Sequence, residues 1–253
     1  MIKRSREWLR LMFVALFCVC ALGQLKAEEI RVAVASNFNG AMKELAERFE
    51  AETDYEVTLI PGSTGKHYAQ IIHGAPFDVF FAADRERPEL LEQGGLIVPG
   101  SRFTYAIGKL VLWSPKAGLV DQEGDVLNED RFRFLAIANP KLAPYGKAAQ
   151  EVLEKRGLWG KLNERIVRGE NIAQTFQFVK TGNADLGFVA YAQMKFPSQL
   201  EQGTFWVVPQ EDYSPIEQQA VLLKERQSTH AFLSYIRSKE ALKIINEYGY
   251  DTP

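Results

Sequence analysis

Short apolar runs alternate with amphipathic segments along this 253-residue chain, and this alternation restricts the fold more than any other feature of the sequence. In the first part of the chain, each apolar run precedes a turn and an amphipathic segment. The predicted strands are residues 30–35, 55–60 and 78–83, and the predicted helices begin near residue 39 and cover 66–73 and 88–93. Consecutive units of this kind form a parallel sheet with helices on both faces, because crossovers between parallel strands are right-handed. The chain is therefore predicted to have an α/β fold.

The same pattern continues in a second set of segments after Phe103. The predicted strands are residues 109–113, 134–138, 185–190 and 218–223, and the predicted helices are 146–156, 171–181, 229–237 and 239–248. No low-complexity linker separates the two sets, so we expect two lobes between which the chain crosses more than once. Lobe I is predicted to comprise residues 28–104 and 216–253, and lobe II to comprise residues 105–215.

The amino terminus resembles an export signal. Its basic residues are Lys3, Arg4, Arg6 and Arg10. An apolar run at 11–22 follows them, and a short polar stretch leads from that run to Ala27. This order is typical of a secretory signal peptide, and the run falls short of the roughly 20 residues that span a bilayer. We predict a signal peptide at residues 1–27, with an uncleaved anchor as the alternative. A lipoprotein site is disfavoured, because Phe17 and Val19 precede the cysteines.

Removal of residues 1–27 changes the composition of the working chain. It removes Cys18 and Cys20, and with them any disulfide, thiol nucleophile or cysteine-metal site. The balance of 30 Lys and Arg against 32 Asp and Glu in the full chain becomes 25 against 31, a net charge of −6. Such an acidic chain lacks the basic surface that nucleic-acid binding needs. We therefore predict an exported protein without a nucleic-acid partner.

Small polar side chains occupy the turns after the first two predicted strands. Ser36 and Asn37 follow the first strand, and the sequence Gly-Ser-Thr-Gly at residues 62–65 follows the second. Open α/β sheets bind ligands at the carboxyl ends of their strands, and a helix that begins there offers unpaired N–H groups. These donors suit an anion. The alternative interpretation is that Asn39 and Thr64 are ordinary N-caps.

Patterns for catalysis or for metal binding are weak. The string GSTGK lacks the spacing of a nucleotide-binding phosphate loop, and no Gly-x-Ser-x-Gly motif is present. The histidines, His67, His73 and His230, show no metal-ligand spacing. Asp78 and Asp84 flank a strand, where single carboxylates more often cap or face solvent than form an acid–base pair. No catalytic residue, metal-cation ligand or cofactor is predicted.

Four strings together resemble a known family. They are VAVASNFNGAM, IPGSTGKHYAQIIHGAPFDVFFAAD, LAIANPKLAPYGKAAQEVL and GENIAQTFQFVKTGNADLGFVA. In this order, over residues 29–248, they are similar to the periplasmic molybdate-binding proteins of molybdate ABC importers. The resemblance implies a two-lobed class II periplasmic binding protein fold. Each lobe would be a mostly parallel sheet flanked by helices, and the cleft between them would close around one tetrahedral oxyanion.

The resemblance also implies the oxyanion-binding residues. They are Ser36, Asn37, Ser63, Thr64, Tyr145 and Ile172, the last through its backbone N–H. Ser63 and Thr64 compete as the direct contact, because some family members carry serine where Thr64 stands. Other members carry tyrosine at the position of Ala190, one residue before Tyr191, so Tyr191 is a weaker candidate. No metal cation would be bound directly, since molybdate or tungstate would be held as an oxyanion by the same residues.

The resulting functional hypothesis is an extracytoplasmic solute-binding protein, not an enzyme. It would capture molybdate or tungstate in the periplasm and deliver it to an ABC transporter permease in the inner membrane. We expect a monomer without a cofactor. The alternatives are a receptor for another tetrahedral oxyanion such as sulfate or phosphate, an exported enzyme on the same fold, and a ligand-free interaction protein.

Overall fold

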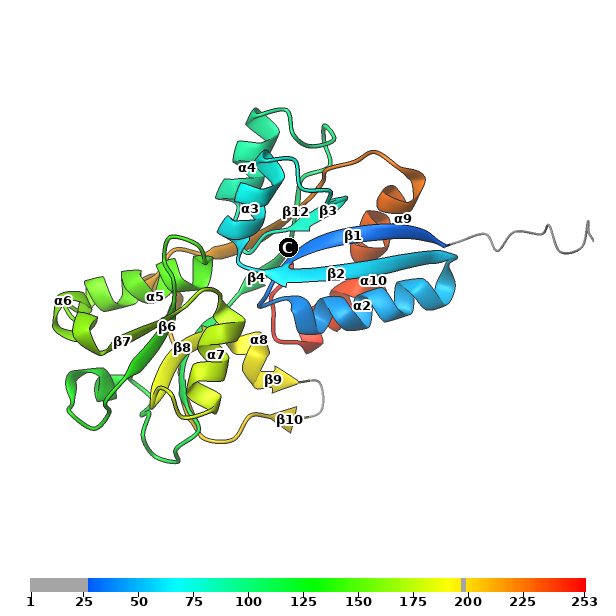
Figure 1. Cartoon of the computed structure of the whole chain (residues 1–253). Coiled ribbons are helices and arrows are strands. Elements are labelled where there is room, and N and C mark those ends of the chain that lie inside the picture. Colours follow the sequence, from blue (N-terminus) through cyan, green and yellow to red (C-terminus); the bar gives the residue numbers. More distant parts are fainter. Residues whose placement is uncertain (1–26, 197–198) are drawn as a thin grey trace, which may run out of the picture.

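The computed structural model describes residues 27–196 and 199–253 (Figure 1). Apart from Ala27, the predicted signal peptide, including Cys18 and Cys20, lies outside the described residues. In the described part, the strands form two five-stranded sheets and one short two-stranded sheet. Figure 1 shows the two large sheets in separate bodies, one containing the blue and cyan strands and the other the green and yellow strands. We assign the first sheet with its helices to lobe I and the second to lobe II.

The elements of lobe I come from both ends of the described chain. The first sheet has the strand order β2-β1-β3-β12-β4. Its strands are β1 (Glu28–Ala35), β2 (Tyr55–Gly62), β3 (Val79–Phe81), β4 (Phe103–Gly108) and β12 (Ile216–Leu222). Its helices are α2 (Asn39–Glu52), α3 (Thr64–Ile72), α4 (Glu86–Gln93), α9 (Gln227–Ile236) and α10 (Lys239–Glu247).

Lobe II is built from the middle of the chain, and its sheet has the order β11-β5-β8-β6-β7. Its strands are β5 (Leu110–Ser114), β6 (Leu135–Ala138), β7 (Ile166–Gly169), β8 (Leu186–Ala190) and β11 (Thr204–Val207). Its helices are α5 (Pro144–Lys155), α6 (Trp159–Leu162), α7 (Ile172–Lys180) and α8 (Tyr191–Met194). The short strands β9 (Lys195–Phe196) and β10 (Gln199–Leu200) follow α8, and the 3-10 turns are Asp125–Asn128, Asn163–Arg165 and Gln210–Asp212.

Each large sheet contains one reversed strand. In lobe I, β1 is parallel to β2 and β3, whereas β12 is antiparallel to both its neighbours. In lobe II, β6 is parallel to β7 and β8, whereas β5 is antiparallel to β8 and β11. The reversed strands β5 and β12 are those that the chain enters directly after crossing between the sheets. The prediction of two mostly parallel sheets flanked by helices is confirmed.

Alternate residues of the strands of lobe I face two different helix layers. Val32 and Val34 pack with α2, α9 and α10, whereas Ala33 packs with α3 and α4. This alternation is the period of two that a strand covered on both faces requires. The apolar face predicted for α2 is also confirmed, since Met42 and Phe49 are buried in the same cluster as Val32.

Several boundaries differ from those predicted. Helix α3 begins at Thr64 instead of residue 66, and strands β4, β7 and β11 were not predicted. The chain leaves the first sheet between Gly108 and Leu110 and returns between Val207 and Ile216. The lobe boundaries at 104/105 and 215/216 stay predictions. Among the described residues, no helix combines the length and the hydropathy needed to cross a membrane.

Candidate functional site

Parallel pairing of β1 with β2 brings the two polar turns together. The register pairs Ala35 with Gly62 at the ends of both strands. The backbone N–H of Ser36 donates to the carbonyl oxygen of Gly62 at 2.9 Å. In lobe II, the parallel pairing of β6 with β7 aligns Ala138 with Gly169 in the same way. The turns that precede α2, α3, α5 and α7 therefore follow strand ends that are paired within each sheet.

These strand ends surround a small cavity of ≈ 10 Å³ between the lobes. It is lined by Ala35, Ser36, Asn37, Gly62, Ser63, Thr64, Ala83, Ala143, Pro144, Tyr145, Asn171 and Ile172. We call this space the anion cavity. All six of the stronger candidates from the sequence lie in this lining, and none of the lining residues carries a charged side chain. Tyr191 is not part of the lining; it begins α8, and its ring centroid lies 6.3 Å from that of Phe205.

Four helices begin at, or within two residues of, the lining of the anion cavity. They are α2 at Asn39, α3 at Thr64, α5 at Pro144 and α7 at Ile172. The first N–H groups of a helix have no partner within it, and the helix dipole gives them a partial positive charge. Ile172 is the first residue of α7, so its backbone N–H is such a donor, while the N-cap Asn171 accepts from Gln174 N at 3.0 Å. The cavity combines positive dipole ends from both lobes.

The interpretation of Asn39 and Thr64 as ordinary N-caps is wrong. The N-cap positions of α2 and α3 are Phe38 and Ser63, and neither side chain makes a capping hydrogen bond. Helix α3 begins earlier than predicted, which leaves Ser63 in extended backbone at the cavity wall. Its hydroxyl oxygen is buried and has no hydrogen-bond partner in the structure. Buried polar atoms are nearly always paired, so the unpaired hydroxyl of Ser63 indicates that a ligand binds at this wall.

The other two hydroxyls at the turns act as acceptors within the protein. Ser36 Oγ accepts from the backbone N–H of Ala173 at 3.4 Å, a contact between the lobes. Thr64 Oγ1 accepts from the backbone N–H of Ala83 at 3.0 Å. A hydroxyl has one hydrogen in addition to its acceptor lone pairs. Both side chains therefore keep a hydrogen that can be donated to a ligand.

Tyr145 lies in the first turn of α5 and is buried at the cavity wall. Burial raises the pKa of its phenol well above the ordinary value, so the hydroxyl stays protonated. Gln218 Nε2 donates to Tyr145 Oη at 3.4 Å across the lobes. Sequence reasoning missed Gln218, although two adjacent glutamines inside a strand segment, IEQQAVL, are a visible signal.

Other direct contacts between the lobes add to those of Ser36 with Ala173 and of Gln218 with Tyr145. The backbone N–H of Gly65 donates to Leu142 O at 2.8 Å, and Arg87 Nη2 donates to Lys141 O at 3.1 Å. At the surface, Lys66 Nζ lies 3.0 Å from Glu170 Oε1. The side chain of Lys66 is half exposed. These contacts hold the two lobes closed over the cavity.

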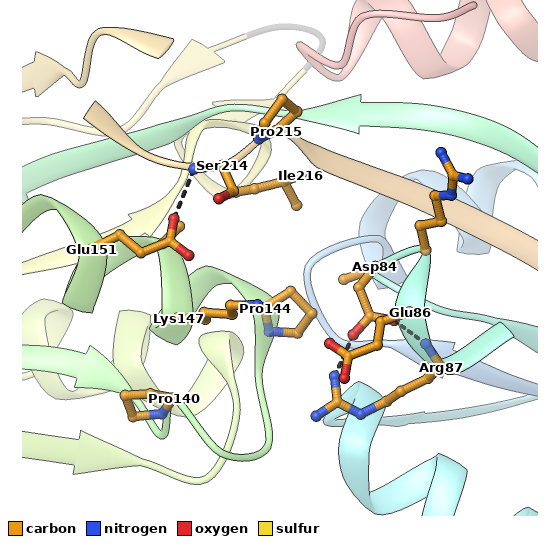
Figure 2. Close-up of a pocket in the computed structure, with 13 residues that line it drawn as sticks. Asp84, Glu86, Arg87, Pro140, Pro144, Lys147, Glu151, Ser214, Pro215 and Ile216 are labelled. Atoms are coloured by element: carbon orange, nitrogen blue, oxygen red, sulfur yellow. Dashed lines mark hydrogen bonds and ion pairs between the residues drawn. The ribbon is translucent and has the colours of Figure 1, made fainter. Parts of the chain in front are cut away.

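A larger space of ≈ 360 Å³ lies beside the anion cavity and shares Ala83 and Pro144 with it. We call this space the charged groove (Figure 2). Its remaining lining residues are Asp84, Arg85, Glu86, Arg87, Pro140, Lys147, Ala148, Glu151, Ser214, Pro215 and Ile216. Asp84 forms a close ion pair with Arg87, and Glu151 accepts from the backbone N–H of Ser214 at 2.7 Å. Its charges are thus largely engaged with neighbouring groups of the protein.

The histidine of α3 is part of the packing beneath the second turn. His67 is buried, and burial lowers the pKa of its ring, so it is neutral at pH 7. A Cβ at Gly62 would lie 2.7 Å from His67 Nε2, so glycine leaves the space that this ring fills. Within residues 27–196 and 199–253, no group of three His, Cys, Asp or Glu side chains is arranged to hold a metal ion.

Comparison with known proteins places the chain in a family. Residues 30–251 match the family of bacterial extracellular solute-binding proteins. The chain is 50% identical to the molybdate-binding protein ModA of Azotobacter vinelandii over 228 residues, 89% of this chain and 90% of the relative. It is 47% identical to ModA of Rhodobacter capsulatus over 229 residues, 89% of both chains.

Solved structures agree with the sequence comparison. The periplasmic molybdate-binding protein of Azotobacter vinelandii superposes with a TM-score of 0.85 at 44% identity, covering 88% of this chain and 99% of that one. This match confirms the predicted class of fold. The relatives are binding proteins, which agrees with the prediction that the chain is not an enzyme. The chain therefore belongs to the bacterial extracellular solute-binding protein family, and relatives of about half identical sequence in that family are molybdate-binding proteins.

Proposed function

We propose that the protein binds molybdate or tungstate in the anion cavity and delivers it to the permease of an ABC importer. The observation that carries this proposal is the lining of the cavity. Neutral donors from both lobes and four helix starts converge there, and the hydroxyl of Ser63 has no partner. Helix starts and neutral hydroxyls bind an anion without a flexible counterion. The relatives named above bind molybdate.

The proposed contacts follow from the hydrogen-bond directions in the structure. Ser36, Ser63, Thr64 and Tyr145 would donate through their hydroxyls, and Ile172 through its backbone N–H. Both hydroxyls of the second turn are available as donors, since Ser63 has no partner within the protein and Thr64, which accepts from Ala83 N, keeps its hydrogen. The side-chain amide of Asn37 donates to Gln218 and Tyr250, so we assign its backbone N–H to the anion. Tyr191 has no role in this arrangement.

Size would separate molybdate from sulfate, because both are doubly charged and tetrahedral. Donors fixed on helix starts define a cavity of one radius. A smaller anion leaves some donors without a partner, and each unmade hydrogen bond in a dry site costs ~1–3 kcal/mol. Two or three such losses correspond to a preference of about 100-fold or more. The net charge of the protein contributes little, since exposed charges beyond ~8 Å are screened at physiological salt.

Calorimetric titration with molybdate, tungstate, sulfate and phosphate tests the proposal. Molybdate and tungstate should bind at least about 100-fold more tightly than sulfate. Equal or tighter binding of sulfate would show that the protein is a receptor for another oxyanion. Replacement of both Ser36 and Thr64 by Ala should abolish the anion-induced rise in melting temperature while the anion-free protein still unfolds cooperatively. Unchanged binding in this double variant would contradict the assigned contacts.

Location and delivery complete the proposal. The predicted signal peptide and the family together support a periplasmic protein. Mass spectrometry of the mature amino terminus should find a chain that begins at Glu28, and a retained residue Met1 would instead indicate an anchor. The permease would recognise the closed lobes, so ATP hydrolysis by the reconstituted importer should require both this protein and the anion.

A further inference from the structure

A network of buried polar side chains lies directly behind the anion cavity. We call it the tyrosine–amide network, and its members are Asn37, Tyr105, Tyr145, Gln218 and Tyr250. All five are buried, and Gln218 is 0% exposed. Gln218 belongs to β12, the strand that the chain enters on its return from lobe II. It is therefore placed where it can contact both lobes.

One backbone carbonyl determines the direction of the hydrogen bonds that link Tyr250, Asn37, Gln218 and Tyr145. Tyr250 Oη lies 2.8 Å from the carbonyl oxygen of Asn37, which can only accept. The single hydroxyl hydrogen of Tyr250 is therefore used there. Tyr250 Oη must then accept from the side chain of Asn37 at 3.2 Å, so the amino group of that amide, Nδ2, faces Tyr250. This contact fixes which way the Asn37 amide points.

The same reasoning fixes the amide of Gln218. Asn37 Nδ2 also lies 2.7 Å from Gln218 Oε1, which must be the carbonyl oxygen because it receives a donor. The hydroxyl of Tyr105 lies 3.0 Å from the same oxygen and 3.1 Å from the carbonyl oxygen of Ala82. The opposite end of the amide, Nε2, consequently faces Tyr145 Oη and donates to it at 3.4 Å. The Tyr145 oxygen is an acceptor in this bond, which leaves its own hydrogen unused.

We propose that Gln218 is a positioning residue, which by donating to Tyr145 directs the Tyr145 hydroxyl hydrogen into the anion cavity. Gln218 does not touch the anion; it sets the polarity of a residue that does. Because the bond joins β12 of lobe I to α5 of lobe II, it forms only when the lobes are close together. This inference rests on the proposed function, since it assigns a role in anion binding.

A glycine opposite this contact supports the assignment. A Cβ on Gly108, the last residue of β4, would collide with Tyr145 Oη and lie 2.8 Å from Gln218 Nε2. Gly108 has no positive φ that would require glycine. The absence of a side chain at this position therefore leaves room for the Gln218–Tyr145 contact itself.

The test is the variant Gln218→Glu, studied by calorimetric titration with molybdate beside the wild type between pH 6 and pH 9. An ionised carboxylate can only accept, so it takes the hydrogen of Tyr145 away from the anion. Affinity relative to wild type should fall by roughly 100-fold at pH 9. Burial raises the pKa of a glutamate. As the pH falls the protonated carboxyl donates to Tyr145 again, and affinity should recover at least tenfold.

The matched control is Gln219→Glu, the same change one residue later. Gln219 contacts Arg102 at 2.8 Å and Thr104 at 3.1 Å and does not line the cavity. The affinity of the Gln219→Glu variant for molybdate should stay within about threefold of wild type, and this ratio should not vary with pH. A Gln218→Glu variant that binds like wild type at pH 9, or with a loss that is the same at every pH, overturns the proposal.

Two further variants keep the test decisive if Gln218→Glu does not fold. Gly108→Ala displaces the Gln218–Tyr145 contact sterically and should weaken molybdate binding. In a protein that also carries Tyr145→Phe, there is no hydroxyl to orient, so Gly108→Ala should reduce the affinity for molybdate little further. If the two losses of affinity simply add in the double variant, the proposed coupling between these positions is contradicted. A wild-type protein that binds no oxyanion would refute the proposed function instead, so the two failures are distinguishable.

Discussion

The anion cavity and the charged groove lie between the same two lobes and share Ala83 and Pro144, but they are lined by different chemistry. The cavity is lined by neutral hydroxyl, amide and backbone groups at four helix starts. The groove contains three basic and three acidic side chains, among them the ion pair between Asp84 and Arg87. In the groove, attraction for an anion is offset by nearby carboxylates.

This difference indicates how an acidic protein can retain an anion. The dipole of a helix start stabilises negative charge at one position. None of the residues that line the cavity has a carboxylate that would offset this attraction. The arginines of the groove already interact with carboxylates of the protein, Arg85 with Glu89 and Arg87 with Asp84. Binding should therefore depend strongly on the neutral cavity and weakly on the charged groove, and the following changes test that contrast.

Charge inserted in the cavity should have the largest effect. Ser63→Asp places a carboxylate beside the dianion, and unit charges 4 Å apart repel by ~4 kcal/mol at an effective dielectric constant of 20. Affinity should fall at least about 1,000-fold. Lys147→Glu changes the charge of the groove by twice as much, yet should alter affinity by less than about threefold. Calorimetric titration measures both, and similar losses would contradict the contrast.

Removal of Arg87, one of the basic side chains of the charged groove, should affect the stability of the protein more than its affinity for the anion. Arg87→Met leaves Asp84 buried without its ion pair, which should lower the free energy of unfolding by ~2 kcal/mol at neutral pH. Burial already raises the pKa of Asp84, and loss of Arg87 raises it further. A raised folded-state pKa gives stability that is present at low pH and lost as the pH rises through that pKa.

The loss in free energy of unfolding caused by Arg87→Met should therefore be larger at pH 8 than at pH 5. Denaturant unfolding at both pH values measures it, with the wild type as the reference. Affinity for molybdate should fall less than about tenfold, because Arg87 also contacts Lys141 O across the lobes. A loss of affinity as large as that of Ser63→Asp would mean that the groove holds the anion.

The surface ion pair between the lobes should contribute least. Glu170→Gln breaks the contact with Lys66, whose side chain is 53% exposed. Exposed pairs contribute ~0–1 kcal/mol, so affinity should fall less than about fivefold. About 0.5 M NaCl should remove even this difference, since the Debye length is then a few ångströms. A larger effect that persists in salt would show that Lys66 attracts the anion directly.

Much of the fold could be predicted because its strands are buried on both faces. The run at β8 is continuously apolar, the predicted run at residues 30–35 of β1 is interrupted by Arg31 alone, and the carboxyl ends of both strands were predicted correctly. Strands β7 and β11 lie at the edges of their sheet and are short and partly exposed, so their residues carry no clear pattern. Strand β4 was missed because the chain changes sheets immediately after it. The position of a strand at the edge of a sheet and the point at which the chain crosses between sheets are both set by the tertiary structure.

The candidate site was predictable in composition but not in geometry. Hydroxyl and amide residues after strands, with helices behind them, indicated an anion, and the family resemblance supplied Tyr145 and Ile172. The sequence left Ser63 and Thr64 as equal candidates. In the structure, Thr64 accepts from Ala83, a residue of a different strand-turn segment, whereas Ser63 has no partner. That both donate to the anion stays a prediction.

By itself, the sequence determined the order of most strands and helices, the neutral chemistry of the turns and the acidic character of the working chain. These properties depend on residues close together along the chain. Only the tertiary structure decided that Gln218, 73 residues after Tyr145, lies against its hydroxyl, and that donors from both lobes face one cavity. Hydrogen-bond direction depends on which groups meet in space, and that is set by packing between distant segments.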